Sequence, residues 1–327
     1  MSLTLVTGAT GFIGRRLALK LAADRLHVRC LVRHPQQAAD LVAAGIELVE
    51  GDVSDPIAVD KACAGAEVIY HLASVLGPAN VPAEVYVKSN VTGTREMIIS
   101  AVRANVKRFI HVSTVGVLGS VGAVPAKEDA PLQPRNIYER TKAEAEGVVT
   151  TAGRERGFPA VIVRPAWVYG PGDRRTLKLF RAICHGRFIM AGRGQALQHP
   201  VHVDDVVRGL ILCGSVAGIE GEIFTLAGAD ILPVRDLCQA IARACGSELP
   251  RFNLPLRPLR VAAALAGLLG RVLRRELPLD ERKLEFFVNN RAYSIEKARA
   301  LLKYNPVVPL DEGLADTADW YRKEGWM

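Results

Sequence analysis

The chain has 327 residues, of which 49% are apolar and 23% are charged, with 29 glycines and 18 prolines. This composition is ordinary for a folded globular protein, and it excludes a disordered or fibrous chain. Lys and Arg outnumber Asp and Glu by 42 to 34, which gives a net charge of +8. Since there is no long basic run and only 6% of the residues are aromatic, nucleic-acid binding is not expected.

Six cysteines, at positions 30, 63, 184, 213, 238 and 245, are scattered without a CxxC pair. Such spacing is typical of reduced thiols in a cytosolic protein, so we expect a cytoplasmic chain with neither a disulfide framework nor a zinc site. The N-terminal residues lack the pattern of a signal peptide. The longest helix-compatible apolar stretch, residues 261–270, is shorter than the roughly 20 residues that cross a bilayer.

The first half of the sequence alternates short apolar runs with longer amphipathic stretches, which is the pattern of repeated strand–helix–strand units. The apolar runs predict strands at residues 3–7, 28–32, 46–49, 68–72, 108–112 and 160–163. Parallel strands need crossover helices on both faces of their sheet. We therefore expect an α/β fold with a doubly wound parallel sheet over residues 1–165.

The second half departs from this rhythm after residue 164. It predicts a helix over residues 203–213, a strand over residues 222–226 and a helix over about residues 233–245. We expect residues 200–228 to return to the sheet domain. Residues 166–199 and 229–327 are then expected to form a smaller C-terminal lobe that binds the substrate.

Three glycines lie in the sequence TGATGFIG, between the first predicted strand and the helix that follows it. At this spacing, glycines permit a tight turn, close approach of the backbone to a pyrophosphate, and close packing of helix on strand. The N-terminus of the helix offers free N–H groups to phosphate oxygens. The segment therefore predicts a dinucleotide-binding turn with Gly8, Thr10, Gly11, Phe12, Ile13 and Gly14 at the cofactor.

The end of the second strand bears on the choice between NAD and NADP. A site for NAD usually has an acidic residue there, which accepts a hydrogen bond from the ribose 2′-hydroxyl. This strand instead runs Cys30-Leu31-Val32-Arg33, and a guanidinium is suited to a 2′-phosphate. Arg33 therefore favours NADP, with NAD as the alternative.

The ends of the third, fourth and fifth strands lie where ligands bind in such sheets. Asp52 is placed to accept a hydrogen bond from the adenine amino group, and Leu72 and Ala73 to pack on the dinucleotide. The residues predicted to line the cofactor from these strand ends are Asp52, Val53, Leu72, Ala73, Ser74, Val112 and Ser113.

A candidate catalytic set consists of Thr114, Tyr138 and Lys142. On a helix, Tyr138 and Lys142 are four residues apart and share a face. A lysine charge beside the phenol, near an oxidised nicotinamide, favours the phenolate and moves its pKa from about 10 toward neutrality. Tyr138 is then expected to be the acid/base, Lys142 to hold the ribose hydroxyls, and Thr114 to hydrogen-bond the oxygen that Tyr138 protonates.

Together these motifs resemble the extended short-chain dehydrogenase/reductase family, within the NAD-dependent epimerase/dehydratase superfamily. The resemblance covers nearly all of the chain and is carried by TGATGFIG, the Gly51-Asp52-Val53 segment, HLAS, NVTGT, VST, YERTK, RPAWVYGPG and VHVDDV. Its pattern is most similar to the 3β-hydroxysteroid dehydrogenase and dihydroflavonol 4-reductase branches. The resemblance implies a Rossmann fold, with Asn90, Pro165, Ala166 and Val168 bordering the nicotinamide.

The histidines and aspartates of the HPVHVDD segment do not predict a metal site. The resemblance places this segment at a strand that leads into a helix, so Asp204 or Asp205 is expected to cap the helix. No metal is therefore expected at His199 and His202. His111, inside the fifth strand, is interpreted as a packed histidine, not a general base.

Three functions are compatible with these features. The first is an NAD(P)-dependent oxidoreductase that transfers hydride to or from a lipophilic or ring ketone or secondary alcohol. The second is a nucleotide-sugar epimerase, and the third is a non-catalytic dinucleotide-sensing protein, which the complete Thr114, Tyr138 and Lys142 set disfavours. A 4,6-dehydratase is set aside because Val115 and Gly116, which follow Thr114, cannot transfer a proton.

Two residues bear on the substrate. Sugar-nucleotide epimerases similar to this chain carry Arg where Gln198 stands, and an amide supplies no charge for a diphosphate. The alternative stays open, because Arg174, Arg175, Arg181 and Arg187 are able to bind a phosphate from another direction. Trp167 offers apolar surface to a hydrophobic substrate. Residues 254–277 are interpreted as a lid over the substrate or as a weak contact with a membrane surface. We also expect a homodimer.

Overall fold

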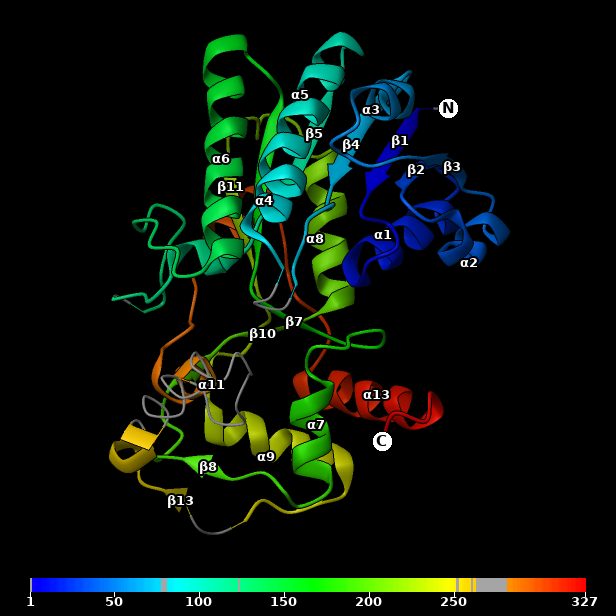
Figure 1. Cartoon of the computed structure of the whole chain (residues 1–327). Coiled ribbons are helices and arrows are strands. Elements are labelled where there is room, and N and C mark those ends of the chain that lie inside the picture. Colours follow the sequence, from blue (N-terminus) through cyan, green and yellow to red (C-terminus); the bar gives the residue numbers. More distant parts are fainter. Residues whose placement is uncertain (1, 78–80, 123, 251–252, 260, 263–280) are drawn as a thin grey trace.

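The computed structural model describes residues 2–77, 81–122, 124–250, 253–259, 261–262 and 281–327. Its centre is a seven-stranded sheet in the order β11-β6-β5-β4-β1-β2-β3, in which every neighbouring pair is parallel (Figure 1). The strand order reverses at β1, so the predicted doubly wound parallel sheet is confirmed. Its strands are β1 (Leu3–Thr7), β2 (His27–Val32), β3 (Glu47–Glu50), β4 (Ala66–His71), β5 (Arg108–Val112), β6 (Ala160–Pro165) and β11 (Ile223–Leu226).

Helices cover both faces of this sheet. On one face α1 contacts α8, which in turn contacts α12, and on the other face α5 lies between α3 and α6. These six helices are α1 (Phe12–Ala23), α3 (Pro56–Cys63), α5 (Gly93–Arg103), α6 (Ile137–Arg156), α8 (Val203–Ser215) and α12 (Glu296–Leu302). Shorter segments join the strands: η1 (Pro35–Gln37), α2 (Ala39–Ala43), α4 (Ala83–Tyr86), the π-helical η2 (Val87–Thr92) and η3 (Val115–Leu118).

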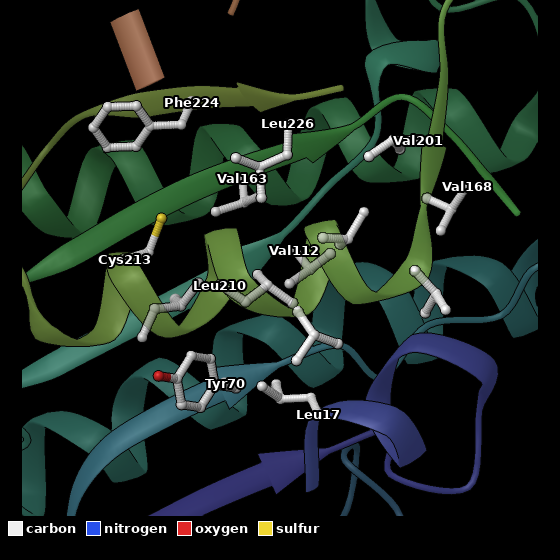
Figure 2. Close-up of a cluster of buried hydrophobic side chains, with 14 of the residues drawn as sticks. Leu17, Tyr70, Val112, Val163, Val168, Val201, Leu210, Cys213, Phe224 and Leu226 are labelled. Carbon is white, nitrogen blue, oxygen red and sulfur yellow. The ribbon is translucent and has the colours of Figure 1, made fainter. Parts of the chain in front are cut away.

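The apolar runs of the sequence are buried on both faces of the sheet. Figure 2 shows Leu17 of α1 and Leu210 of α8 packed with Val112 and Val163 of the central strands. Residues that alternate with these, such as Phe109, belong to a second buried cluster formed with α3, α5 and α6. Because both faces are covered by apolar helices, continuous rather than alternating hydrophobic runs specify these strands.

A second group of elements lies below the sheet in the view of Figure 1. It contains three two-stranded sheets, in which β7 pairs with β10, β9 with β12, and β8 with β13. The paired strands are β7 (Trp167–Tyr169), β8 (Met190–Ala191), β9 (Leu197–Gln198), β10 (Pro200–His202), β12 (Leu232–Pro233) and β13 (Asn253–Leu254). The helices are α7 (Leu177–Cys184), α9 (Val234–Cys245), α11 (Glu281–Val288) and α13 (Leu310–Lys323).

The segment expected to return to the sheet domain does so in part. Strand β10 pairs with β7 and lies outside the main sheet, whereas α8 packs on α1 and β11 adds an edge strand beside β6. The division of the chain into a sheet domain and a substrate lobe stays a prediction.

One expectation about the cysteines is wrong. Cys184 at the end of α7 and Cys245 at the end of α9 form a disulfide, with their Cα atoms 5.3 Å apart. The two residues are 61 positions apart in the sequence, so only the packing of α7 on α9 brings them together. The other four cysteines are free and buried.

A buried ion pair fixes α6 against the sheet. The Arg164 guanidinium, on β6, donates to both carboxylate oxygens of Glu146 on α6, at 3.0 and 2.7 Å, and both side chains are buried. Its remaining nitrogen donates to the backbone carbonyl of Glu128. The Glu128 carboxylate in turn accepts from the backbone N–H of Thr225 on β11. This network of hydrogen bonds fixes the position of α6 along the strands of the sheet.

Removing Glu146 should therefore destabilise the fold. In Glu146→Ala the Arg164 charge stays buried without its partner, and we expect the free energy of unfolding to fall by about 3–5 kcal/mol. Asp319→Ala is the control, because its pair with Arg322 is exposed and its loss should cost less than about 1 kcal/mol. Urea denaturation followed by circular dichroism measures both. Equal stabilities of the two variants would contradict this account of α6.

Candidate active site

A cavity of about 1160 Å³ lies at the carboxyl ends of the parallel strands. It is lined by the turn between β1 and α1, by the ends of strands β2 to β6, and by the start of α6. Most of the residues predicted from the sequence meet there: Gly8, Thr10, Gly11, Phe12, Ile13, Gly14, Arg33, Asp52, Val53, Leu72, Ala73, Ser74, Val112, Ser113, Thr114, Tyr138, Pro165, Ala166 and Val168.

The glycine turn at the cavity has no room for side chains at two of its three positions. Gly8 has a φ of 71°, and a Cβ there would lie 2.8 Å from the backbone nitrogen of Ala73. A Cβ at Gly14 would lie 2.2 Å from the carbonyl oxygen of Gly8, so α1 packs directly on the turn. Gly11 is exposed at the start of α1, where its Cβ would narrow the approach to the helix N-terminus. This cradle fits a dinucleotide pyrophosphate.

Arg33 and Asp52 lie together at the mouth of the cavity. Arg33 is exposed, and within the described part of the chain no carboxylate is within ion-pair distance of it. Asp52 accepts hydrogen bonds from the backbone N–H and hydroxyl of Ser54, at 2.9 and 2.7 Å. Burial raises the pKa of Asp52, but these hydrogen bonds and the charges of Arg33 and Lys88 outweigh it and hold the pKa below its usual value. The carboxylate is therefore ionised and able to accept.

Tyr138 lies in the first turn of α6, which the Asn136 side chain caps by accepting from the backbone N–H of Glu139, at 3.0 Å. Burial raises the pKa of the Tyr138 phenol to about 12, although the charge of Arg175 and a hydrogen bond from Ser74 act to lower it. The shift toward neutrality, which was expected beside an oxidised nicotinamide, stays a prediction. The cation that lowers the pKa of this phenol is Arg175 and not Lys142.

Lys142 lies beneath the cavity instead of on its wall. The side chain is 1% exposed, and its Nζ lies 3.4 Å from Nε2 of His111. Burial lowers the pKa of Lys142 to about 8, against the opposing effect of the Glu146 charge. Burial and the Lys142 charge also lower the pKa of His111 well below its usual value, so His111 is neutral and packed, as predicted.

Asn90 supports the site from below and does not line the cavity. It lies in the π-helical turn η2, where its Oδ1 accepts from the backbone N–H of Val75 at 2.7 Å. Its Nδ2 donates to the hydroxyl of Thr141 on α6, at 3.0 Å. Its backbone carbonyl accepts from the Thr94 hydroxyl, which also contacts Nε2 of the buried His71. These hydrogen bonds tie α6 to the end of β4.

Residues 4–227 of this chain match the NAD dependent epimerase/dehydratase family. The chain belongs to this family. Among its relatives, the 4-hydroxy-2-methyl-3-oxo-4-farnesyl-3,4-dihydroquinoline-1-oxide ketoreductase of Stigmatella aurantiaca is 30% identical, over 95% of this chain and 94% of that protein. The 3beta-hydroxysteroid-dehydrogenase/decarboxylase isoform 1 of Arabidopsis thaliana is 29% identical, over 96% of this chain and 78% of that protein.

A solved structure also resembles this member of the epimerase/dehydratase family. A double mutant of the dTDP-glucose 4,6-dehydratase from Streptomyces venezuelae, solved with NAD bound, has a TM-score of 0.78 and 27% identity, covering 100% of this chain and 98% of that one. The resemblance predicted from the motifs is confirmed. The protein is an NAD(P)-dependent oxidoreductase of the extended short-chain dehydrogenase/reductase type.

In this family member, the two predicted substrate residues do not line the cavity. Trp167 packs against Tyr169 and Phe286, with ring centres 6.3 and 6.5 Å apart. Gln198 is 1% exposed, and its side-chain nitrogen donates to the backbone carbonyl of Phe286 at 3.2 Å. Both residues therefore pack within the second group of elements, against its aromatic residues, and do not belong to the cavity wall.

The prediction that an aspartate caps α8 is wrong. The capping group is the His202 ring, which accepts from the backbone N–H of Asp204 at 3.3 Å. Asp204 is held instead by Arg16 of α1, and Asp205 accepts from the backbone N–H groups of Val307 and Val308. Within the described residues no cluster of His, Cys, Asp or Glu is arranged to hold a metal ion.

Other residues also line the cavity wall, and of these only Arg174 and Arg175 were considered from the sequence, as residues able to bind a phosphate. Those from the glycine-rich connection after β7 and from the C-terminal end are Pro171, Gly172, Asp173, Arg174, Arg175, Trp320, Glu324 and Trp326. The first five directly follow or belong to the RPAWVYGPG motif, which is a signal of proximity to the site. The last three carry no such signal, because only the packing of α13 on the molecule brings them to the cofactor cavity. Further missed wall residues are Arg15, Arg16, Leu19, Leu31, Val32, Gln37, Gly51, Leu76 and Ser89.

No described helix is long and apolar enough to cross a membrane. Most of the segment 254–277, interpreted as a lid or a contact with a membrane surface, lies outside the described residues. The homodimer and the membrane contact stay predictions.

The phenol of Tyr138 should remain protonated in the cofactor-free protein well above neutral pH. Because burial raises its pKa to about 12, the near-ultraviolet spectra of the wild type and Tyr138→Phe should show no phenolate difference between pH 7 and about 10. A phenolate band lost in Tyr138→Phe near pH 7 would contradict the structure and restore the lysine-tuned phenol predicted from the sequence.

Proposed function

We propose that the protein is an NADP-dependent reductase or dehydrogenase of a lipophilic or ring ketone or the corresponding secondary alcohol. The observation that carries the proposal is a single cavity that holds the glycine turn, Thr114 and Tyr138. Such a cavity joins a cradle for a dinucleotide to a proton donor and a hydrogen-bonding hydroxyl.

The residues of the cavity divide into those for the cofactor and those for the proton. Gly8, Gly11 and Gly14 would hold the pyrophosphate, and Asp52 would accept from the adenine amino group. Pro165, Ala166 and Val168, which line the same cavity, would border the nicotinamide. The cofactor, when bound, supplies or accepts the hydride. The hold of Lys142 on the ribose hydroxyls stays a prediction, because its side chain lies beneath the cavity.

Tyr138 would donate the proton to the substrate oxygen during reduction and take it back during oxidation. A raised pKa keeps the phenol protonated at neutral pH, which suits a donor. The Thr114 hydroxyl lines the same cavity and would hydrogen-bond the same oxygen; its own oxygen accepts from the backbone N–H of Gly116 at 3.1 Å, which fixes its orientation. The positive charge of Arg175 favours the phenolate that remains after proton transfer.

An apolar ketone is favoured over a nucleotide sugar as the substrate. Gln198 is uncharged and already bonded to the backbone of Phe286, so it is not available to a nucleotide diphosphate. Two relatives whose names indicate ketone or alcohol substrates, a ketoreductase and a 3beta-hydroxysteroid-dehydrogenase/decarboxylase, also favour this choice. The alternative is a nucleotide-sugar epimerase, which the positive charges of Arg174 and Arg175 at the cavity support.

Replacing the phenol tests the proposed proton donor. Tyr138→Phe keeps the ring but removes the transferable proton, so turnover of a ketone that the wild type reduces should fall by about 10² or more. The dissociation constant for the dinucleotide should hardly change. Steady-state rates with a 3-ketosteroid or a flavanone, together with calorimetric cofactor titration, measure both quantities. Unaltered turnover would remove Tyr138 from the proposal.

Arg33 is proposed to pair with the 2′-phosphate of NADP. A charge-assisted contact of this kind contributes about 1.5–3 kcal/mol, or about 10- to 150-fold in affinity. In Arg33→Asp the added carboxylate repels a phosphate and accepts from a ribose hydroxyl, so the preference should change to NAD. Fluorescence titration with both dinucleotides measures the ratio. Equal affinity of the wild type for NAD and NADP would refute the assignment.

A further inference from the structure

The C-terminal end of the chain reaches the wall of the cofactor cavity. Trp320 and Glu324 of the α13 region and Trp326 beyond it line the same cavity as the glycine turn, more than 300 residues earlier in the sequence. Arg174 lines it from the connection after β7. We call Arg174, Arg181 and residues 320–327 the C-terminal clasp.

Aromatic and polar contacts fix the end of the clasp. The Arg174 guanidinium lies over the Trp326 ring, with its carbon 4.8 Å from the ring centre. The Arg181 side chain donates to the backbone carbonyl of Trp326. The Trp326 ring also meets that of Trp320 edge-on at 4.8 Å and stacks with Tyr321 at 6.2 Å. Trp326 is therefore a built part of the wall and not a loose end.

The loop that carries Arg174 is tied to both α13 and α1. The Tyr321 hydroxyl donates to the backbone carbonyl of Asp173 at 2.7 Å, and the buried Asp173 carboxylate accepts from the backbone N–H groups of Arg175 and Thr176. On the other side, a Cβ at Gly172 would lie 3.3 Å from the ring of Phe12, the first residue of α1. The loop thus faces the helix end that fits the pyrophosphate.

The arginines of the cavity differ in how their charges are compensated. Arg15 pairs with Asp40 at 2.6 Å, and Arg16 forms two hydrogen bonds with Asp204. Arg174 has no carboxylate within ion-pair distance among the described residues, and its contact is the Trp326 ring. Its side chain is exposed and lines the same cavity as the glycine turn. A stacked guanidinium also loses less rotamer freedom when it binds a phosphate.

We propose that Arg174, held on Trp326, binds the diphosphate of the dinucleotide, so that the C-terminal clasp is part of the cofactor site. The α1 N-terminus and Arg174, which line one cavity, then both contact the diphosphate. Since the diphosphate is common to NAD and NADP, the clasp raises the affinity for both equally, whereas Arg33 distinguishes them. This inference rests on the dinucleotide site of the proposed function.

The test is calorimetric titration of the full chain with NAD, NADP and adenosine 2′-monophosphate, a fragment that lacks the diphosphate. Arg174→Gln should weaken both dinucleotides about 10-fold and leave the fragment unchanged. Arg174→Lys, which keeps the charge, should recover most of the loss. Trp326→Ala should weaken both dinucleotides about 2- to 5-fold, and Trp326→Phe should bind like the wild type.

Arg187→Gln is the matched control, because Arg187 is exposed and absent from the cavity wall. It should bind all three ligands like the wild type. Unchanged affinity of Arg174→Gln for both dinucleotides overturns the inference, and so does an equal loss for the fragment. A wild type that binds neither dinucleotide instead overturns the proposed function. The two failures are therefore distinguishable.

Discussion

The contact between the Gly8 carbonyl and Gly14 is the constraint on which the site depends. It leaves no space for a side chain at residue 14, so α1 begins immediately above the end of β1. Because all seven strands of the main sheet are parallel, the other strand ends meet at the same edge. The helix N-terminus, the strand ends and the start of α6 therefore enclose one cavity, and the backbone N–H groups of the helix start give it a site suited to a phosphate.

Helix α6, which carries Tyr138, is held in place by two buried polar networks. The Arg164–Glu146 pair fixes α6 on β6, and the Asn90–Thr141 bond fixes it to the turn before α5. Together they place the first turn of α6 at the cavity while the second turn, with Lys142, stays beneath. Burial then has opposite effects on the two ionisable groups: it raises the pKa of the Tyr138 phenol and lowers that of the Lys142 ammonium. In both cases burial removes water that would stabilise the charged form, so the neutral phenol and the neutral amine are favoured.

Local patterns predicted the sheet well, because its strands are covered on both faces and read as continuous apolar runs. They also predicted most of the cavity wall, since the ends of parallel strands share one edge. They failed where distant packing decides the outcome. Asp204 bonds to Arg16 and does not cap α8. The packing of α7 on α9 brings Cys184 next to Cys245. The position of α13 places Trp326 at the cavity. The raised pKa of Tyr138 was missed because the spacing of Tyr138 and Lys142 contains no information about burial.

The central claim is hydride transfer between a nicotinamide and an apolar ketone. Mass spectrometry can follow deuterium from NADPH labelled at both hydrogens of the nicotinamide C4, with the protein and an equimolar mixture of a 3-ketosteroid, a flavanone and UDP-glucose. A parallel sample contains the same mixture with NAD+ in place of NADPH, because epimerisation of a sugar needs an oxidised dinucleotide. We expect one deuterium in the alcohol formed from a ketone, with UDP-glucose recovered unchanged in both samples. Unlabelled ketones together with an isomerised sugar would contradict it.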